Sequence, residues 1–448
     1  MDVLLWILLV ACILVSRAVS VFGRRQDGSY DTIQRYPHVD PFGIDLMWQI
    51  RRDFQRGRLS EGMRLRHVLY GSTFSTKHLW ENYIYTIEPE NIDAINKDKS
   101  ENFEKSAWAS EAAKHIGNGV LLNEGDAWRR SRAMLNPIFG SSAAEVPTLM
   151  EPKVRRLVAQ MRALQEKKGA VELHSLIDKF MLDVVTEFLF GKSADCLENP
   201  RSPEGEDAIQ FLTDVRSFDG PSAKFIAVGT PARLELLASI WRLKKTVASM
   251  QGFFRRKLQD IMTSTETASA RSPPWSVFKR MKATGIPEDQ IQAELQNIFF
   301  ASWYTTSALL ANTIYILLRN QDVLGRLRQE IQPLQGKPPT NQDLRKMEYL
   351  GLVLMEGEGG TEPGDGADES HTGGSEIPTA FFTHLPFGLG PRACLGKQMA
   401  KDEVSYVIVR LLQEFSLLET KPGLEHSSFR EAEAVSFYNA DGVWISVK

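Results

Sequence analysis

The spacing of hydrophobic positions predicts a chain built mainly from helices. Apolar residues recur every three or four positions over long stretches, which is typical of helices with one buried face. The longest such stretch runs from Pro287 to about Arg319 and would form a helix about 50 Å long at 1.5 Å per residue. The other predicted helices are Ile44–Gly57, Pro89–Asn96, Pro147–Glu166, Leu173–Gly191, Gly205–Phe218, Leu234–Thr263, Asn341–Met355 and Asp402–Glu414.

Shorter stretches alternate apolar and polar residues, as strands do. Near the start of the chain they predict strands at His67–Thr73 and Tyr83–Ile87, and near its end at Phe415–Glu419, Ala434–Tyr438 and Val443–Val447. We find no internal repeat, and 448 residues suffice for one large domain or two ordinary ones. The expected fold class is mainly α with small β-sheets (α+β).

The first residues predict a membrane anchor. Val3–Val15 is an uninterrupted apolar run, and the anchor would cover residues 1–23. A cleaved signal peptide is the alternative, but Asp2 stands where such peptides carry positive charge. Arg24 and Arg25 just beyond the run place the rest of the chain on the cytoplasmic side, by the positive-inside bias.

Composition excludes some classes of function. A net charge of −3 and a pI of about 6.3 argue against a nucleic-acid-binding protein, which would need a basic surface. The three cysteines are Cys12, Cys196 and Cys394, and the first lies in the apolar leader. No disulfide framework is therefore expected, and a reducing compartment fits.

The stretch Pro386–Gly396 sets one cysteine inside a glycine-rich turn, directly before a predicted helix. Gly390 and its neighbours allow a tight turn in which the backbone approaches a flat ligand closely. The sulfur of Cys394 would face unpaired amide N–H groups and the positive end of the helix, and both favour the thiolate. Arg392 could form a charge-assisted bond to a carboxylate.

Two other interpretations of this turn stay open. A single cysteine is most often a small buried hydrophobic residue. Gly388-x-Gly390-x-x-Ala393 also matches part of a dinucleotide-binding fingerprint. This second interpretation is the weaker one, because Pro391 and Arg392 lie inside the turn and no repeating pattern of strands and helices surrounds it.

A second candidate lies after the turn at Gly125, where a helix is expected to begin with Asp126 as its N-cap. Trp128 and Arg132 would lie one helical turn apart on the same face. An indole N–H and a guanidinium group are both pure donors and suit a carboxylate. Taken alone, such a pair is more often a tryptophan packed under a surface arginine.

The spacing Phe387-x-x-Gly390-x-Arg392-x-Cys394-x-Gly396 resembles the cysteine signature of the cytochrome P450 family at every fixed position. The resemblance implies haem b, with Cys394 as the iron ligand. It also implies that the haem contacts are Trp128, Arg132, Phe387, Gly390, Arg392 and Gly396. The similarity covers nearly the whole chain, and Phe180–Gly191 looks like the corresponding helix of fungal microsomal alkane and fatty-acid hydroxylases.

This resemblance implies a monooxygenase that inserts one oxygen atom of O2 into a C–H bond of a lipophilic substrate, such as an alkane or a fatty acid. Electrons would come from NADPH through a separate flavoprotein reductase. The enzyme would be anchored in the endoplasmic reticulum membrane, with residues 24–448 as its cytoplasmic catalytic domain. No contact with nucleic acid is expected.

The long predicted helix carries the catalytic residue that the resemblance implies. Thr305 aligns with the residue that guides protons, whereas Ser302 and Tyr304 replace the family's glycine and acid. A phenol is a poor proton source beside a carboxyl group, so slow or leaky turnover is expected. The alternative is that the Thr305 hydroxyl only bonds back to the preceding helical turn.

One region departs from the family pattern. Glu356 should begin a Glu-x-x-Arg motif, but position 359 is Gly359, and residues 357–377 are acidic and glycine-rich. The sheet and the arginine-bearing meander normally found there are missing. We therefore expect an incomplete fold, and the alternative function is a catalytically impaired or haem-deficient remnant.

Overall fold

The computed structural model describes residues 33–78, 81–105, 117–228, 248–263, 276–359, 385, 387–424, 429–433 and 437–448. The predicted anchor at residues 1–23 lies outside these residues, as does most of the segment 357–377. Within the described residues, no helix has the length and apolar character needed to cross a membrane.

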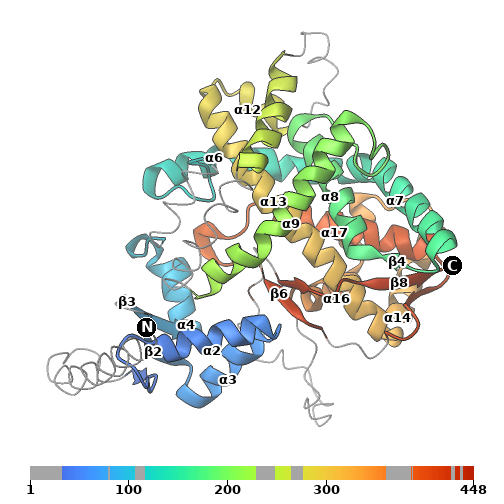
Figure 1. Ribbon diagram of the computed structural model, residues 1–448. Helices are drawn as coiled ribbons and strands as arrows, with labels where there is room; N and C mark the ends of the chain where they lie inside the picture. Colours follow the sequence, from blue (N-terminus) through green and yellow to red (C-terminus); the bar gives the residue numbers. More distant parts are fainter. Residues whose placement is uncertain are drawn as a thin grey trace, which may run out of the picture.

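The described residues are mostly helical, as the sequence predicts (Figure 1). The helices before residue 120 are α2 (Ile44–Gln55), α3 (Leu59–Tyr70), α4 (Pro89–Asp93), the π-helix η1 (Ala94–Asp98) and the 3-10 helix η2 (Ser100–Asn102). The α-helices that follow are α6 (Gly125–Ser142), α7 (Val146–Lys168), α8 (Leu173–Phe190), α9 (Pro203–Val228), α12 (Val277–Lys282), α13 (Glu288–Arg319), α14 (Gln321–Ile331), α15 (Asn341–Lys346), α16 (Glu348–Gly359) and α17 (Lys397–Glu414), and the short 3-10 helices are η3 (Ala143–Glu145), η4 (Gln332–Leu334) and η6 (Gly390–Arg392).

The strands form three small sheets. In the first, β2 (Thr73–His78) pairs in parallel with β1 (Gln34–Arg35) and antiparallel with β3 (Glu81–Thr86). The second has the order β4 (Val171–Glu172), β8 (Trp444–Val447) and β5 (Leu418–Thr420), and the third joins β6 (Glu431–Glu433) to β7 (Phe437–Asn439). The mainly α fold class with small sheets is confirmed.

Helix α13 forms the centre of the molecule and packs against α8, α16 and α17 (Figure 1). Its side chains are buried along most of its length, which explains why its sequence is apolar on more than one face. Trp303, one of the largest buried side chains, donates its indole N–H to the carbonyl of Asp178 on α8 at 3.0 Å. Helix α7 packs on α8 and α17 and completes this core, which we call the helical body.

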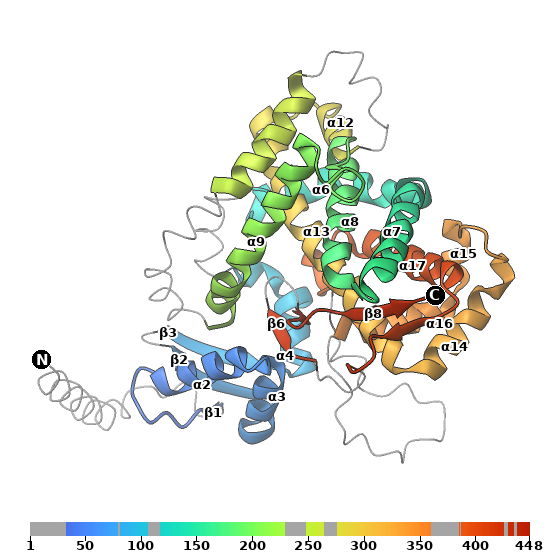
Figure 2. The same ribbon diagram turned by 45° about the vertical axis from the view of Figure 1, so that its right-hand side comes forward.

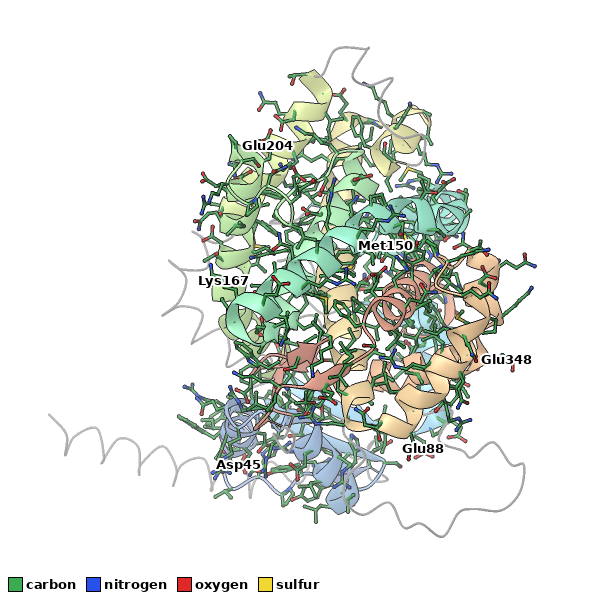
Figure 3. All side chains as sticks on the ribbon, turned by 90° about the vertical axis from the view of Figure 1, so that its right-hand side faces the viewer. Asp45, Glu88, Met150, Lys167, Glu204 and Glu348 are labelled. Atoms are coloured by element: carbon green, nitrogen blue, oxygen red, sulfur yellow. The ribbon has the colours of Figure 1, made fainter. Side chains whose placement is uncertain are left out.

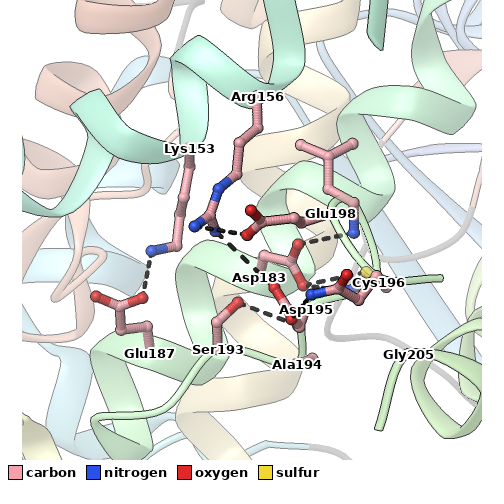
Figure 4. A network of polar contacts seen from close by, with 12 residues as sticks. Lys153, Arg156, Asp183, Glu187, Ser193, Ala194, Asp195, Cys196, Glu198 and Gly205 are labelled. Carbon is pink, nitrogen blue, oxygen red and sulfur yellow. Dashed lines mark hydrogen bonds and ion pairs between the residues drawn. The ribbon is translucent and has the colours of Figure 1, made fainter. Parts of the chain in front are cut away.

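The loop that follows α8 is held by polar contacts with α7 and α8 (Figure 4). The buried Asp183 carboxylate accepts the backbone N–H groups of Cys196 and Leu197, both at 2.9 Å. Arg156 of α7 pairs with Glu198 at 2.6 Å. The Cys196 thiol donates to the carbonyl of Lys179 and to the Asp183 carboxylate, both at 3.2 Å, and burial raises its pKa well above the ordinary value.

The first sheet and the helices α2 and α3 make a smaller N-terminal unit at the base of the helical body (Figure 2). Figure 3 shows Asp45 in this unit and Met150 of α7 in the helical body. The unit has its own hydrophobic cluster, formed by Tyr36, Leu46, Met47, Ile50, Leu59 and Phe74.

Several sequence predictions need correction. Residues 67–70 belong to α3, and the strand that was expected from His67 begins only at Thr73. The helix expected over Asn341–Met355 is two helices, because Thr340 and Asp343 form a capping box and the first helix ends at Lys346. Helix α14 was not predicted at all.

Candidate functional site

The glycine-rich stretch folds into the tight turn that the sequence predicts. Gly388 and Gly390 have φ angles of 67° and 66°, a left-handed conformation that favours glycine. The turn closes when Cys394 donates its backbone N–H to the carbonyl of Phe387 at 2.8 Å. Three residues later α17 begins at Lys397, so the cysteine precedes the amino-terminal end of that helix.

The turn lies directly against η1. A Cβ atom added at Gly390 would fall 1.8 Å from the backbone oxygen of Asn96, a contact that no side chain can make. Gly390 is therefore required by close backbone packing as well as by its φ angle. The sequence suggested a close approach to a ligand at this turn, and the structure adds a close approach to the chain itself.

Cys394 is exposed to solvent, whereas Cys196 is buried. Desolvation by surrounding protein raises the pKa of the Cys394 thiol, although the N–H of Gly396 and the positive charges of Arg132 and Lys397 lower it. The sequence predicted that amide N–H groups and the helix end favour the thiolate, and the N–H of Gly396 does act in that direction, but desolvation outweighs it. A bound metal ion would reverse this balance, because it displaces the thiol proton.

Arg392 lies on the ring of Trp128, with its guanidinium carbon 4.4 Å from the ring centroid. It donates to the carbonyl of Asn123 at 3.0 Å and to the Glu124 carboxylate at 2.5 Å. The structure thus brings together two predicted site residues from segments more than 250 positions apart. Sequence reasoning missed Glu124, since a single carboxylate before a helix carries no motif.

Arg132 also belongs to this group. Its guanidinium group is close enough to Cys394 for the two to interact electrostatically. Desolvation lowers the pKa of Arg132, whereas the interaction with Cys394 raises it. Trp128 and Arg132 both lie on α6, as predicted. Asp126 is not the N-cap, because α6 already begins at Gly125, and its carboxylate instead accepts from Arg129 at 2.6 Å.

The two remaining predicted cofactor contacts border the cysteine. The ring of Phe387 has Lys397 and Lys401 above it, with their Nζ atoms 5.7 and 5.6 Å from its centroid. Gly396 caps the start of α17, and a Cβ atom there would meet only Phe139, at 3.8 Å. Because Gly396 has no side chain, it adds no bulk beside the cysteine.

Thr305 lies on the least buried strip of α13. Ala301 is exposed in the middle of this otherwise buried helix, and Ser302 and Thr305 beside it are half-buried. The Thr305 hydroxyl donates to the carbonyl of Ala301 at 2.6 Å, which is the backbone contact that the sequence left open as an alternative. Tyr304 is buried against Trp303 and Tyr438, so it does not lie on this strip.

A cavity of about 150 Å³ lies elsewhere, near the end of α13 and beside β5 and β8. Tyr315, Arg319 and Trp444 are among its lining residues, and none of the predicted site residues lines it. We therefore place the candidate site at the cysteine turn, and Thr305 on α13 stays a predicted part of it.

The sequence of this chain is similar to those of known proteins. The family model "Cytochrome P450" matches residues 42–357 and 375–436. "Cytochrome P450 monooxygenase FPY7" of Fusarium mangiferae is 28% identical, covering 94% of this chain and 90% of that protein. "Cytochrome P450 52A13" of Debaryomyces hansenii is 25% identical, covering 99% of this chain and 97% of that protein.

The same comparisons locate a difference. The alignment to the Fusarium relative has 487 positions, and this chain fills about 421 of them, which is 94% of its 448 residues. The remaining 66 or so positions of the relative have no counterpart in this chain. The family match itself breaks between residues 357 and 375, within the segment that departs from the family pattern. With most of its length matched on both sides of that break, the chain belongs to the cytochrome P450 family.

Proposed function

We propose that this chain is a haem-thiolate monooxygenase that inserts one oxygen atom of O2 into a C–H bond of a lipophilic substrate, such as an alkane or a fatty acid. The observation that carries the proposal is the exposed residue Cys394 directly before α17, with Arg132 close enough to act on the charge of its thiol group. The two fungal relatives support it, because both are named as cytochromes P450. The choice of substrate rests on the resemblance of Phe180–Gly191 alone.

The residues of the site fit haem b. Cys394 would ligate the iron, and its sulfur already receives the backbone N–H of Gly396. Arg132, Arg392 and the indole of Trp128 would hold the propionate groups, while Gly390, Gly396 and Phe387 shape the turn beside the sulfur. When bound, thiolate-ligated haem supplies the oxygen chemistry.

The protein's own contribution is charge and proton placement. The N–H of Gly396 and the charge of Arg132 favour the thiolate form of Cys394, which desolvation opposes. The Thr305 hydroxyl now donates to the carbonyl of Ala301. Once that hydrogen bond is broken, the hydroxyl would be able to hold a proton on the partly exposed strip of α13. Tyr304 stands where the family has an acid, and a phenol is a much weaker proton source than a carboxyl group, so we expect slow proton delivery.

The enzyme needs an electron source outside the catalytic chain. Family members generally take electrons from a reductase, and we propose an NADPH-dependent flavoprotein reductase as the partner. We also propose attachment to the endoplasmic reticulum membrane through residues 1–23, with residues 24–448 as the cytoplasmic catalytic domain. The apolar run and the arginines that follow it support this placement.

The test is the absorption of the purified protein, reduced and exposed to carbon monoxide. The unsubstituted chain should give the shifted Soret band of thiolate-ligated haem, and Cys394→Ala should abolish it. Cys196→Ala, at the buried cysteine, is the matched control and should keep the band. Haem that binds with the same spectrum in Cys394→Ala would refute the ligand assignment.

A second function, a catalytically impaired or haem-deficient remnant, is favoured by the break in the family match and by the missing Glu-x-x-Arg arginine at Gly359. Loss of one partner of a buried ion pair costs about 3–5 kcal/mol. This alternative predicts substoichiometric haem and NADPH consumption without product. Stoichiometric haem with NADPH use tightly coupled to product would refute it.

A further inference from the structure

The amino-terminal half of α13 holds the loop that leads into α6. Glu294 and Asn297 are completely buried on this helix. The Glu294 carboxylate accepts the backbone N–H of Val120 at 2.7 Å, and the Asn297 side chain accepts that of Leu121 at 3.1 Å. The amide group of Asn297 also donates to the carbonyl of Gly117 at 3.0 Å. Two side chains of one helix therefore fix this loop at three backbone groups.

Glycines let the loop pack directly on α13. A Cβ atom added at Gly119 would fall 2.6 Å from the Asn297 side chain and 2.8 Å from the carbonyl oxygen of Ala293. One added at Gly117 would fall 2.9 Å from the Cβ atom of Ala293. Any larger residue at either position would require the loop or the helix to shift, because packed protein interiors have no room for such contacts.

The same carboxylate is linked to the cysteine turn through α6. Ser131 of α6 is completely buried, donates its hydroxyl to Glu294 and accepts the side-chain amide of Asn123 at 3.3 Å. The backbone carbonyl of Asn123 accepts from Arg392 at 3.0 Å, and Glu124 pairs with the same guanidinium group. Three hydrogen bonds therefore connect α13 to the arginine that is predicted to bind a propionate.

We propose that Glu294 and Asn297 are positioning residues of the cofactor site. They hold the loop and α6 against α13, so that the groups that contact Arg392 stay in place and orient its guanidinium group toward a haem propionate. A buried carboxylate is unfavourable unless donors satisfy it, and the Ser131 hydroxyl and the Val120 N–H do so here. This inference rests on the proposed function, because it requires that the chain binds haem.

The first test is hydrogen exchange of the full-length chain without haem, compared for the unsubstituted protein, Glu294→Leu and Glu294→Gln. Loss of a hydrogen bond to a charged group should make the Val120 amide exchange about tenfold faster or more in Glu294→Leu. Glu294→Gln keeps an acceptor oxygen and should largely restore protection. Glu288→Leu, at an exposed glutamate of the same helix, is the matched control and should exchange like the unsubstituted chain. Unchanged exchange in residues 117–124 of Glu294→Leu would overturn the inference.

The second test is the rate of haem loss to excess apomyoglobin. Glu294→Leu should lose haem about tenfold faster, whereas Glu294→Gln and Glu288→Leu should stay close to the unsubstituted rate. Ser131→Ala breaks the same link with a smaller change and should act in the same direction, so it takes the place of Glu294→Leu if that variant does not fold.

Haem dimethyl ester, whose propionates carry no charge, distinguishes the positioning of Arg392 from a general structural role of the buried carboxylate. The faster loss in Glu294→Leu should largely vanish with the ester. Equal acceleration with both cofactors, or none with haem, would overturn the inference. If the unsubstituted chain gives no Soret band, the proposed function fails and this inference fails with it, whereas a normal band without an effect of Glu294→Leu removes only this inference.

Discussion

The helical body and the N-terminal unit bury aromatic residues in very different surroundings. Phe180 of α8 is completely buried in a cluster that extends through α7, α8, α13 and α17. Phe74 of β2 is just as buried, but its cluster contains few residues, and the same unit has large exposed hydrophobic residues such as Trp48, Val68 and Ile84. The burial of one residue therefore does not determine how much of the molecule is destabilised when that residue is replaced.

The two regions also differ in their buried charges. In the helical body, Asp402 and Glu403 of α17 are adjacent and buried, and Oδ2 of Asp402 has no hydrogen-bond partner among the residues that the structure describes. In the N-terminal unit, Asp45 accepts from His38 at 2.7 Å and from the backbone N–H of Val39 at 2.8 Å. We therefore expect the helical body to weaken at higher pH and the N-terminal unit at lower pH.

The largest expected effect comes from truncating the two buried phenylalanines. Phe180→Ala should lower the free energy of unfolding of the whole protein by about 3–5 kcal/mol, since it leaves a cavity in the main core. Phe74→Ala should destabilise the N-terminal unit by a comparable free energy, but it should increase hydrogen exchange only in residues 33–86. Denaturant titration with hydrogen exchange checks both variants. A global loss of stability in Phe74→Ala equal to that of Phe180→Ala would contradict the separation of the two regions.

The second effect is the pH dependence of the helical body. Burial, and then the charge of Asp402, raise the pKa of Glu403 to about 8. The pKa of Glu403 in the folded protein lies above its unfolded value of about 4.5. Its contribution to the free energy of unfolding is therefore complete below pH 4.5 and is lost as the pH rises through the folded pKa, near 8. Because the two pKa values differ by about 3.5 units, the unfolding free energy should fall by about 4 kcal/mol across this window.

Glu403→Gln should flatten this dependence in denaturant titrations between pH 5 and pH 8. Glu419→Gln, at an exposed carboxylate of β5, is the control and should leave the dependence unchanged. An unchanged slope in Glu403→Gln would show that this carboxylate is not the group that titrates.

The smallest effect concerns the N-terminal unit. Burial would raise the pKa of Asp45, but hydrogen bonds from His38, Val39 and Leu46 outweigh it and lower the pKa. Its contribution is therefore present above the unfolded value of about 3.8 and is lost as pH falls through the folded pKa. Asp45→Asn should cost about 1 kcal/mol at pH 7, because the pair is only partly buried.

This cost should appear as faster hydrogen exchange in α2 at pH 7, with little change in the helical body. Asp98→Asn, at an exposed residue, serves as the control. Equal exchange rates in α2 with and without the Asp45 substitution would assign the local stability to the hydrophobic cluster alone.

Local patterns were enough to predict the helices and the turn of the candidate site. The helix at Glu288–Arg319 and the turn at Gly388 and Gly390 agree with their sequence patterns, because periodicity and positive φ angles depend on neighbouring residues. The strand expected from His67 failed, because alternation over a few residues cannot distinguish a strand from the end of a packed helix.

The sequence by itself determined that a cysteine precedes a helix, and that arginines and a tryptophan occur at family spacings. Only the tertiary structure decided that Glu124 pairs with Arg392, and that desolvation raises the pKa of Cys394. The physical reason is that hydrogen bonds and desolvation depend on distances in space between segments far apart in the chain, whereas turn and helix preferences act between near neighbours.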